Sequence, residues 1–253
     1  MSRKFLYSIL VGIFTLLSLN SPAQEVKDTL RVLFVGNSYT YYENLPQVVS
    51  VLSEKTGTVL LTRKVTIGGA KLSQHWRGAR GLTSREEISN GNYNIVVLQE
   101  WSLGAVNEKD SAEYYLGLFS GLIRDKGAKP FYYLTWAREK SPEQQETISK
   151  VYRETAAANG ATVVPVGEAW ALARTERPDF RLYNHDGSHP SELGTYLAAC
   201  VFVATLTGEL PESIPRQISA RDGSGESLIL MMLPQADVEF CRSIALKTLE
   251  VQH

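Results

Sequence analysis

The stretch Arg31–Thr40 reads RVLFVGNSYT and decides how this chain folds. Its first part, Arg31–Gly36, contains four consecutive large apolar residues and ends at a glycine, which predicts a buried strand. Gly36 lets the backbone turn sharply after that strand. The polar residues that follow are therefore expected at the carboxyl edge of a sheet, with Ser38 among them.

The rest of the chain alternates short apolar runs with segments of helical spacing. Further strands are predicted at Val59–Ile67, Asn94–Gln99, Pro130–Trp136 and Thr162–Val166. Helices are predicted at Leu45–Lys55, Leu72–Arg80, Ala112–Arg124, Pro142–Ala158 (with Ser141 as N-cap), Ser191–Leu206 and Val238–Leu249. A loop-rich region is expected between Val166 and His189, and a surface loop at Ile214–Gly225. Such alternation indicates an α/β fold in which helices cover both faces of a parallel sheet.

Length and charge narrow the classes of function. The chain has 253 residues, 43% of them hydrophobic, which is enough for one α/β domain with a sizeable core. Its formal net charge is -1. Because there is no basic excess to attract phosphates, we expect no nucleic-acid partner. Oligomeric state is not indicated by the sequence.

The N-terminus has the layout of a secretory signal. Arg3 and Lys4 precede an apolar stretch, Leu6–Leu19, and Ala23 supplies a small residue for cleavage. The apolar stretch is short for a bilayer, which takes about 20 residues. We therefore predict a signal peptide over 1–23, a single mature domain over 24–253, and a secreted or periplasmic protein without stable membrane insertion. An uncleaved N-terminal anchor is the alternative.

The chain has two cysteines, Cys200 and Cys241. Cys200 lies in the apolar run Leu197–Leu206, which favours two buried free thiols. A disulfide between them is the alternative, since an exported protein folds under oxidising conditions.

Ser38 needs a base if it is to react, and one histidine is well placed in sequence to supply it. Residues 186–190 read DGSHP just before a predicted helix. An Asp three residues before a His in a tight loop can hold its carboxylate against Nδ1 and leave Nε2 free for a serine. This favours Asp186 and His189 over the neighbouring His185. Each motif also has a plainer interpretation, since Ser38 and His189 could simply cap helices.

The two motifs together resemble the first and last sequence blocks of the SGNH (GDSL-like) hydrolases, over roughly Val32 to Leu206. The resemblance implies a three-layer α/β/α sandwich with a central five-stranded parallel sheet of the flavodoxin-like kind. It also implies a Ser-His-Asp triad of Ser38, His189 and Asp186 that works without a cofactor or metal.

The same resemblance implies an oxyanion hole. Its first donor is the amide of Ser38, and its second is the amide of a glycine after the second strand, here Gly69 with Gly68 as the near alternative. The family's third donor, an asparagine in a Gly-x-Asn-Asp block, is absent. Residues 97–102 read VLQEWS instead, similar to a branch of the family with "VLQ" at this place. Gln99 carries a carboxamide and can donate N–H, so it is the candidate third donor; a buried structural glutamine is the alternative.

Aromatic residues and one more histidine follow the strand ends. Tyr39, Trp101 and Trp136 are candidate substrate-binding residues because aromatic faces suit sugar rings, although they also suit plain packing. His75 is a candidate for lining the cleft, with a structural role as the alternative. No spacing of histidines and carboxylates calls for a metal.

These features predict an exported carboxylic ester hydrolase whose partner is a small-molecule or glycan ester. Export and the aromatic residues favour removal of short acyl groups, such as acetyl, from carbohydrate. The alternatives are a lipase or thioesterase for longer acyl chains and a non-catalytic glycan-binding module on the same fold.

Overall fold

A five-stranded parallel sheet forms the centre of the molecule in a computed structural model that describes residues 27–250. Its strands are β1 (Asp28–Gly36), β2 (Thr58–Thr66), β3 (Ile95–Leu98), β4 (Lys129–Tyr133) and β5 (Thr162–Val164). Their order is β2-β1-β3-β4-β5, and each neighbouring pair is parallel. The predicted flavodoxin-like α/β sandwich is confirmed.

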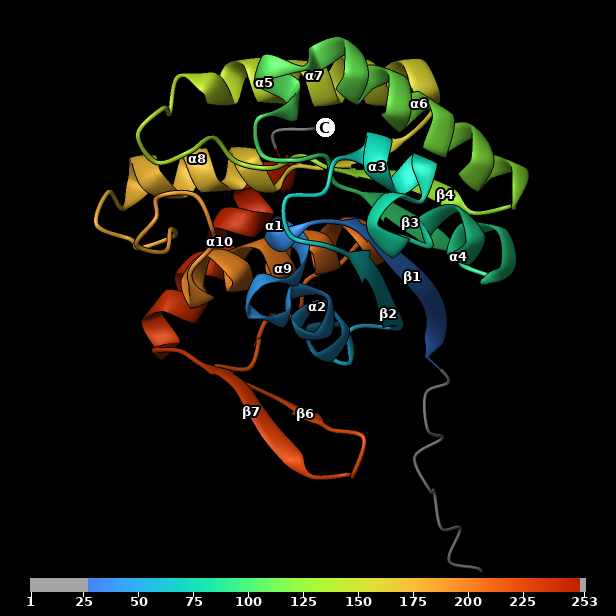
Figure 1. Cartoon of the computed structure of the whole chain (residues 1–253). Helices are drawn as coiled ribbons and strands as arrows, with labels where there is room; N and C mark the ends of the chain where they lie inside the picture. Colours follow the sequence, from blue (N-terminus) through green and yellow to red (C-terminus); the bar gives the residue numbers. More distant parts are fainter. Residues whose placement is uncertain (1–26, 251–253) are drawn as a thin grey trace, which may run out of the picture.

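Helices cover the sheet on both faces (Figure 1). One face carries α3 (Leu72–Arg77), α4 (Ser84–Asn90), α5 (Gly104–Asn107), α6 (Lys109–Asp125) and α7 (Gln144–Asn159). The other carries α2 (Leu45–Ser53), α8 (Val166–Glu176), α9 (Glu192–Thr207) and α10 (Gln235–Glu250). Short helical turns α1 (Ser38–Tyr41), η1 (Tyr42–Asn44) and η2 (Ala79–Gly81) complete the set.

The strand β1 explains why the chain folds around its first apolar run. It pairs with β2 on one side and β3 on the other, and Val32, Leu33, Phe34 and Val35 are all 0% exposed. Alternate side chains of β1 enter the two separate cores on the two faces of the sheet. A strand buried on both faces needs a continuous apolar sequence, and β1 has one.

The structure differs from the sequence-based expectation in two regions. The segment expected to be loop-rich contains α8, which begins directly after β5 and buries Ala169, Trp170 and Ala173. The expected surface loop at 214–225 is instead part of an antiparallel hairpin of β6 (Gln217–Arg221) and β7 (Ser227–Met232). This hairpin extends away from the main sheet (Figure 1).

Smaller corrections concern element ends. The helix expected from residue 142 begins at Gln144, and Ser141 makes no side-chain cap to it, because a turn separates the two. The helix α4 was not predicted at all.

Cys200 and Cys241 are both buried and both free.

The predicted signal peptide over 1–23 lies outside the described residues. Within residues 27–250, no helix combines the length and the apolar character that crossing a membrane requires.

Candidate active site

Ser38 is the first residue of α1 and lies just past the carboxyl end of β1. Asn37 caps this helix, since its side-chain oxygen accepts from the Tyr39 amide at 3.1 Å. The side-chain nitrogen of Asn37, Nδ2, donates to the Ala70 carbonyl at 2.9 Å. One side chain therefore fixes both the turn that carries Ser38 and the loop after β2.

Gly36 is required at this turn for space. A Cβ on Gly36 would lie 2.4 Å from Thr40 Oγ1 and 2.5 Å from Gln99 Oε1. The sequence argument expected a freedom of backbone angle, but Gly36 does not have a positive φ. The glycine instead lets two buried polar side chains approach the backbone beside Ser38.

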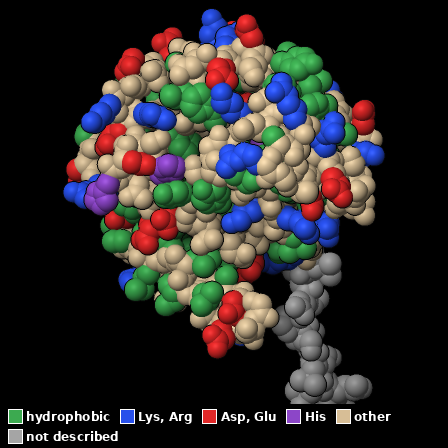
Figure 2. Space-filling view, in the orientation of Figure 1, with side chains coloured by type: hydrophobic (Ala, Val, Ile, Leu, Met, Phe, Trp, Pro, Cys, Tyr) green, Lys and Arg blue, Asp and Glu red, His purple; other side chains and the backbone are tan. Residues whose placement is uncertain are grey.

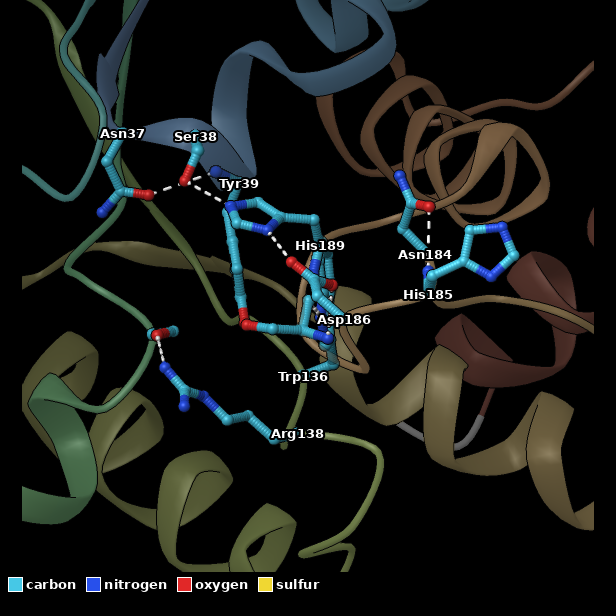
Figure 3. Close-up of polar contacts among 11 residues, drawn as sticks. Asn37, Ser38, Tyr39, Trp136, Arg138, Asn184, His185, Asp186 and His189 are labelled. Carbon is cyan, nitrogen blue, oxygen red and sulfur yellow. Dashed lines mark hydrogen bonds and ion pairs between the residues drawn. The ribbon is translucent and has the colours of Figure 1, made fainter.

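The structure brings Ser38, His189 and Asp186 together (Figure 3). The Ser38 Oγ and His189 Nε2 are 2.9 Å apart. The carboxylate of Asp186 accepts from His189 Nδ1 on the other side of the ring. This hydrogen bond assigns the proton to Nδ1 and leaves the lone pair of Nε2 facing the serine hydroxyl, which is the arrangement a general base needs.

The loop before α9 holds this geometry through local hydrogen bonds. Asp186 Oδ1 accepts from the amides of Ser188 at 3.0 Å and His189 at 2.9 Å. The Asn184 amide donates to the His189 carbonyl at 2.8 Å and closes the loop. Ser191 then caps α9 by accepting from the Gly194 amide at 3.1 Å. The close spacing of Asp and His in sequence is thus enough to set their contact.

Asp186 stays ionised over a wide pH range. Partial burial alone would raise the pKa of its carboxyl. The hydrogen bonds from His189 and from the Ser188 and His189 amides outweigh burial and lower that pKa to about 2. A permanent anion behind the imidazole favours the imidazolium that forms when His189 accepts a proton.

Two tyrosines pack on the imidazole. The Tyr42 ring stacks on His189 at 4.4 Å between centroids and 20° between planes. Tyr39 meets the same ring edge-on at 5.7 Å, and its hydroxyl is 2.7 Å from Ser188 Oγ. Sequence reasoning missed the role of Tyr42, because contact with a histidine 147 positions away exists only in the folded chain.

A cavity of about 410 Å³ opens at this point. The residues that line it are Asn37, Ser38, Tyr39, Tyr41, Tyr42, Gly68, Gly69, Trp101, Ser102, Arg138, Ser188 and His189. Polar and aromatic side chains dominate this lining, and no aliphatic side chain occurs among these described residues. Of the candidate substrate-binding residues, Tyr39 and Trp101 line the cavity.

Gly69 occupies a turn that aims its amide. The Ala70 amide donates to the Ile67 carbonyl at 3.0 Å, and Gly69 has φ +68°, as the third residue of a type II turn requires. The Gly68 carbonyl accepts from Arg80 at 3.1 Å. Because N–H and C=O of a trans peptide point in opposite directions, the Gly69 N–H points away from Arg80. This distinguishes Gly69 from Gly68 as the amide available to the cavity.

The structure does not place Gln99 at the cavity, where its predicted oxyanion role would need it. Gln99 is 0% exposed and does not line the cavity. Its Oε1 accepts from the Asn37 amide and from Thr40 Oγ1, both at 2.9 Å, and its Nε2 donates to the Glu100 carbonyl. The carboxamide therefore helps to fix the turn before Ser38, which favours the buried-glutamine alternative.

His75 and Trp136 also lie behind the cavity wall. His75 is 0% exposed, with Nε2 2.9 Å from the Gly36 carbonyl and Nδ1 2.6 Å from Ser84 Oγ. Burial lowers its pKa to about 4, so the ring is neutral near pH 7. Trp136 is 1% exposed and stacks on Tyr39 at 4.7 Å. Both residues support the site from inside the core.

Glu100 is a further buried group that the sequence did not single out. Its carboxylate accepts from the amides of Leu72 at 3.2 Å and Trp101 at 2.7 Å, and so joins the end of β3 to the start of α3. Burial raises its pKa to about 7. The carboxylate thus helps hold the segment that runs from Gly69 into α3.

No cluster of three or more His, Cys, Asp or Glu side chains in residues 27–250 is arranged to hold a metal ion. The groups that the site offers are a hydroxyl with its base and two backbone amides, those of Ser38 and Gly69. A first-turn amide such as that of Ser38 has no partner inside its own helix. Such a set can attack a carbonyl carbon and hold the negative oxygen that results.

Comparisons with known proteins agree on the fold. No family model and no curated protein sequence matches the chain. A proposed SGNH hydrolase from Slackia heliotrinireducens is 26% identical, with a TM-score of 0.62, over 71% of this chain and 100% of its own. A DUF4886 family protein from Bacteroides uniformis has a TM-score of 0.69 at 22% identity, over 89% and 96%. The acetyl xylan esterase AlAXEase has a TM-score of 0.55 at 16% identity, over 68% and 98%.

Proposed function

This chain belongs to the SGNH/GDSL-like hydrolase superfamily, and on that premise we propose that it is an exported serine esterase. Ser38 is the proposed nucleophile, His189 its base and Asp186 the carboxylate that orients the base. The observation that carries the proposal is the 2.9 Å contact between Ser38 Oγ and His189 Nε2 at the wall of an open cavity.

The reaction runs in two halves. Ser38 Oγ attacks the ester carbonyl while its proton passes to His189 Nε2, and the carbonyl oxygen takes up negative charge. When this tetrahedral intermediate collapses, the carbon–oxygen bond to the alcohol breaks and His189 gives its proton to the leaving alcohol. Water, deprotonated by His189, then releases the acid from the acyl-Ser38 intermediate in the same way.

The amides of Ser38 and Gly69 are the proposed oxyanion donors. The Ser38 amide begins a helix, and the Gly69 amide points away from the contact that Gly68 makes with Arg80. Neither depends on a flexible side chain, so both are in place before the charge develops, which is where electrostatic catalysis gains most.

Short acyl groups on carbohydrate are the proposed substrates. A lining without aliphatic side chains offers little to a long acyl chain, whose binding rests on burying apolar surface. Tyr42 and Trp101 line the cavity, and aromatic rings of this kind can pack on sugar rings. The neighbour AlAXEase is an acetyl xylan esterase, which is in keeping with acetyl removal here.

The test is hydrolysis of p-nitrophenyl acetate by the mature chain, residues 24–253, beside Ser38→Ala. We expect a loss of about 10⁴-fold or more in kcat for the variant, the scale at which removing a triad member acts. Ser224→Ala, in the exposed β6–β7 turn, is the matched control. Equal rates for wild type and Ser38→Ala would overturn the proposal.

Chain-length preference is measured in the same assay. A kcat/KM that falls from the acetyl to the octanoyl ester supports a short-acyl esterase. A rising value supports the lipase or thioesterase alternative.

A further inference from the structure

We propose that the cavity takes esters that carry a carboxylate, and that Arg138 binds that carboxylate. This inference rests on the proposed esterase function and names the substrate class of the same site. O-acylated acidic sugars, in which the carboxylate belongs to the alcohol part of the ester, are the class that fits.

The charge of the cavity lining is one-sided. Arg138 is a lining residue, and Asp and Glu are absent from the described residues that form this lining. Asp186 lies behind His189 and spends its carboxylate on His189 and two backbone amides. A neutral sugar ester gains nothing from such a cation, whereas an anionic one does.

Arg138 has no carboxylate partner, unlike several other arginines of this chain. Among the described residues, no acidic oxygen lies within 4.0 Å of it, whereas Arg153 pairs with Glu168, and Arg177 pairs with Asp237 at 2.9 Å. The guanidinium contacts only a neutral oxygen, Ser102 Oγ, at 3.4 Å. An exposed arginine at a cavity wall keeps most of its N–H donors for a ligand.

One hydroxyl contacts the guanidinium, and two more line the same cavity. Ser102 is its contact, and the other two are the Tyr39 hydroxyl and Ser188 Oγ, 2.7 Å apart. A carboxylate has two oxygens and accepts several hydrogen bonds, so an arginine beside hydroxyl donors suits it well.

A second arginine, Arg80, contacts the backbone of a lining residue. Arg80 donates to the Gly68 carbonyl at 3.1 Å, and no carboxylate of residues 27–250 pairs with it. In Figure 2 both Lys or Arg and Asp or Glu side chains lie around the purple histidines, so the positive charge is confined to the cavity itself. Anionic substrates are therefore attracted as well as bound.

The position of Arg138 limits how far from the scissile ester the charge of the substrate can lie. In Figure 3 its guanidinium lies across the open space from Ser38 and His189. The carboxylate must then be separated from the scissile ester by roughly the width of the cavity. Two kinds of ester meet that condition, an acylated sugar acid and a dicarboxylic acyl group such as succinyl. The aromatic faces of Tyr42 and Trp101 favour the sugar acid.

The test compares acetylated methyl galacturonoside with acetylated methyl galactoside, which differ in one carboxylate. We expect wild type to prefer the acidic substrate in kcat/KM by about 10- to 100-fold, the range of one hydrogen-bonded charge pair. The preference should disappear in Arg138→Gln, reverse in Arg138→Glu, and shrink with added salt. Lys140→Gln, a nearby exposed cation outside the lining, is the matched control and should keep the preference.

Two further measurements keep this proposal separate from the esterase proposal. Calorimetry measures the binding of methyl galacturonoside to Ser38→Ala, which cannot turn over an ester. This binding should be lost in the Ser38→Ala, Arg138→Gln double variant. A preference for p-nitrophenyl hemisuccinate over the butyrate ester, without a galacturonoside preference, would reassign the carboxylate to the acyl part and overturn the sugar-acid assignment. Absence of all these preferences in wild type, or their survival in Arg138→Gln, would overturn the role of Arg138.

Discussion

Two histidines approach the end of β1 from different elements. Each has its Nε2 at the same distance from an atom there, but they differ in exposure and in hydrogen-bond partners. His189, from the loop before α9, has Nε2 2.9 Å from Ser38 Oγ. His75, from α3, has Nε2 2.9 Å from the Gly36 carbonyl. The His189 side chain is 26% exposed and faces a cavity, whereas His75 is 0% exposed with both ring nitrogens occupied.

The comparison teaches that residue type and proximity do not make a base. A ring that donates to a backbone carbonyl and accepts from a serine hydroxyl has no lone pair left for substrate. Burial also holds the pKa of His75 near 4, because the charged ring would lose its water. His75 is therefore a structural support for the strand end that carries Ser38, and His189 is the reactive group.

The largest expected effect comes from removing the reactive histidine, His189. His189→Ala should lower kcat for p-nitrophenyl acetate by about 10⁴-fold or more, because Ser38 loses its base. The free energy of unfolding should change little, since the ring is partly exposed. His185→Ala is the matched control, because His185 lies in the same loop and lines a different cavity. Similar losses in both variants would contradict the assignment of His189.

The next largest effect comes from removing the supporting histidine, His75. His75→Ala removes a buried ring and both of its hydrogen bonds, so we expect the free energy of unfolding in urea to fall by about 2–4 kcal/mol. Loss of kcat should be far smaller than in His189→Ala and should accompany a shifted position of the Gly36 turn. An unchanged stability with a kcat loss as large as that of His189→Ala would reverse the two roles.

The smallest effect comes from the buried carboxyl of Glu100, which accepts from the first amide of α3. Glu100 has a pKa near 7 because it is buried. Since this pKa lies above the ordinary glutamate value of 4.5, the contribution of Glu100 to stability is fully present below pH 4.5 and is lost as pH rises through 7. Glu100→Gln should therefore gain stability relative to wild type by up to about 3 kcal/mol between pH 5 and pH 8.

Urea unfolding of both proteins at the two pH values measures this gain, with the exposed Glu212→Gln as control. His75 acts with the opposite sign at lower pH, since its depressed pKa makes its contribution disappear as pH falls from 6.5 toward 4. A pH-independent difference between Glu100→Gln and wild type would contradict the perturbed carboxyl.

The main sheet was predictable because its central strands, β1, β3 and β4, are largely buried on both faces and are therefore rich in apolar residues. Asp186 and His189 were also predictable as a pair, because a three-residue spacing in one tight loop is a local constraint. The helix α8 and the β6–β7 hairpin were missed. The helix α8 follows its strand after a single residue, Pro165, which left no clear turn signal. The hairpin extends away from the main sheet and buries few side chains, so its burial has no regular pattern.

The sequence by itself determined the strands of the main sheet, most of the helices that cover it, and the residues at the sheet edge. Tertiary structure decided which of those residues face the cavity. Gln99, His75 and Trp136 carry chemistry that suits a site, but each is turned into the core, where buried polar groups must find partners. Arg138 and Tyr42 carry no local signal, and they meet the cavity because parallel strand ends converge there in space. Periodicity records which side of an element is apolar, whereas the partner that a polar side chain finds depends on residues far away in the chain.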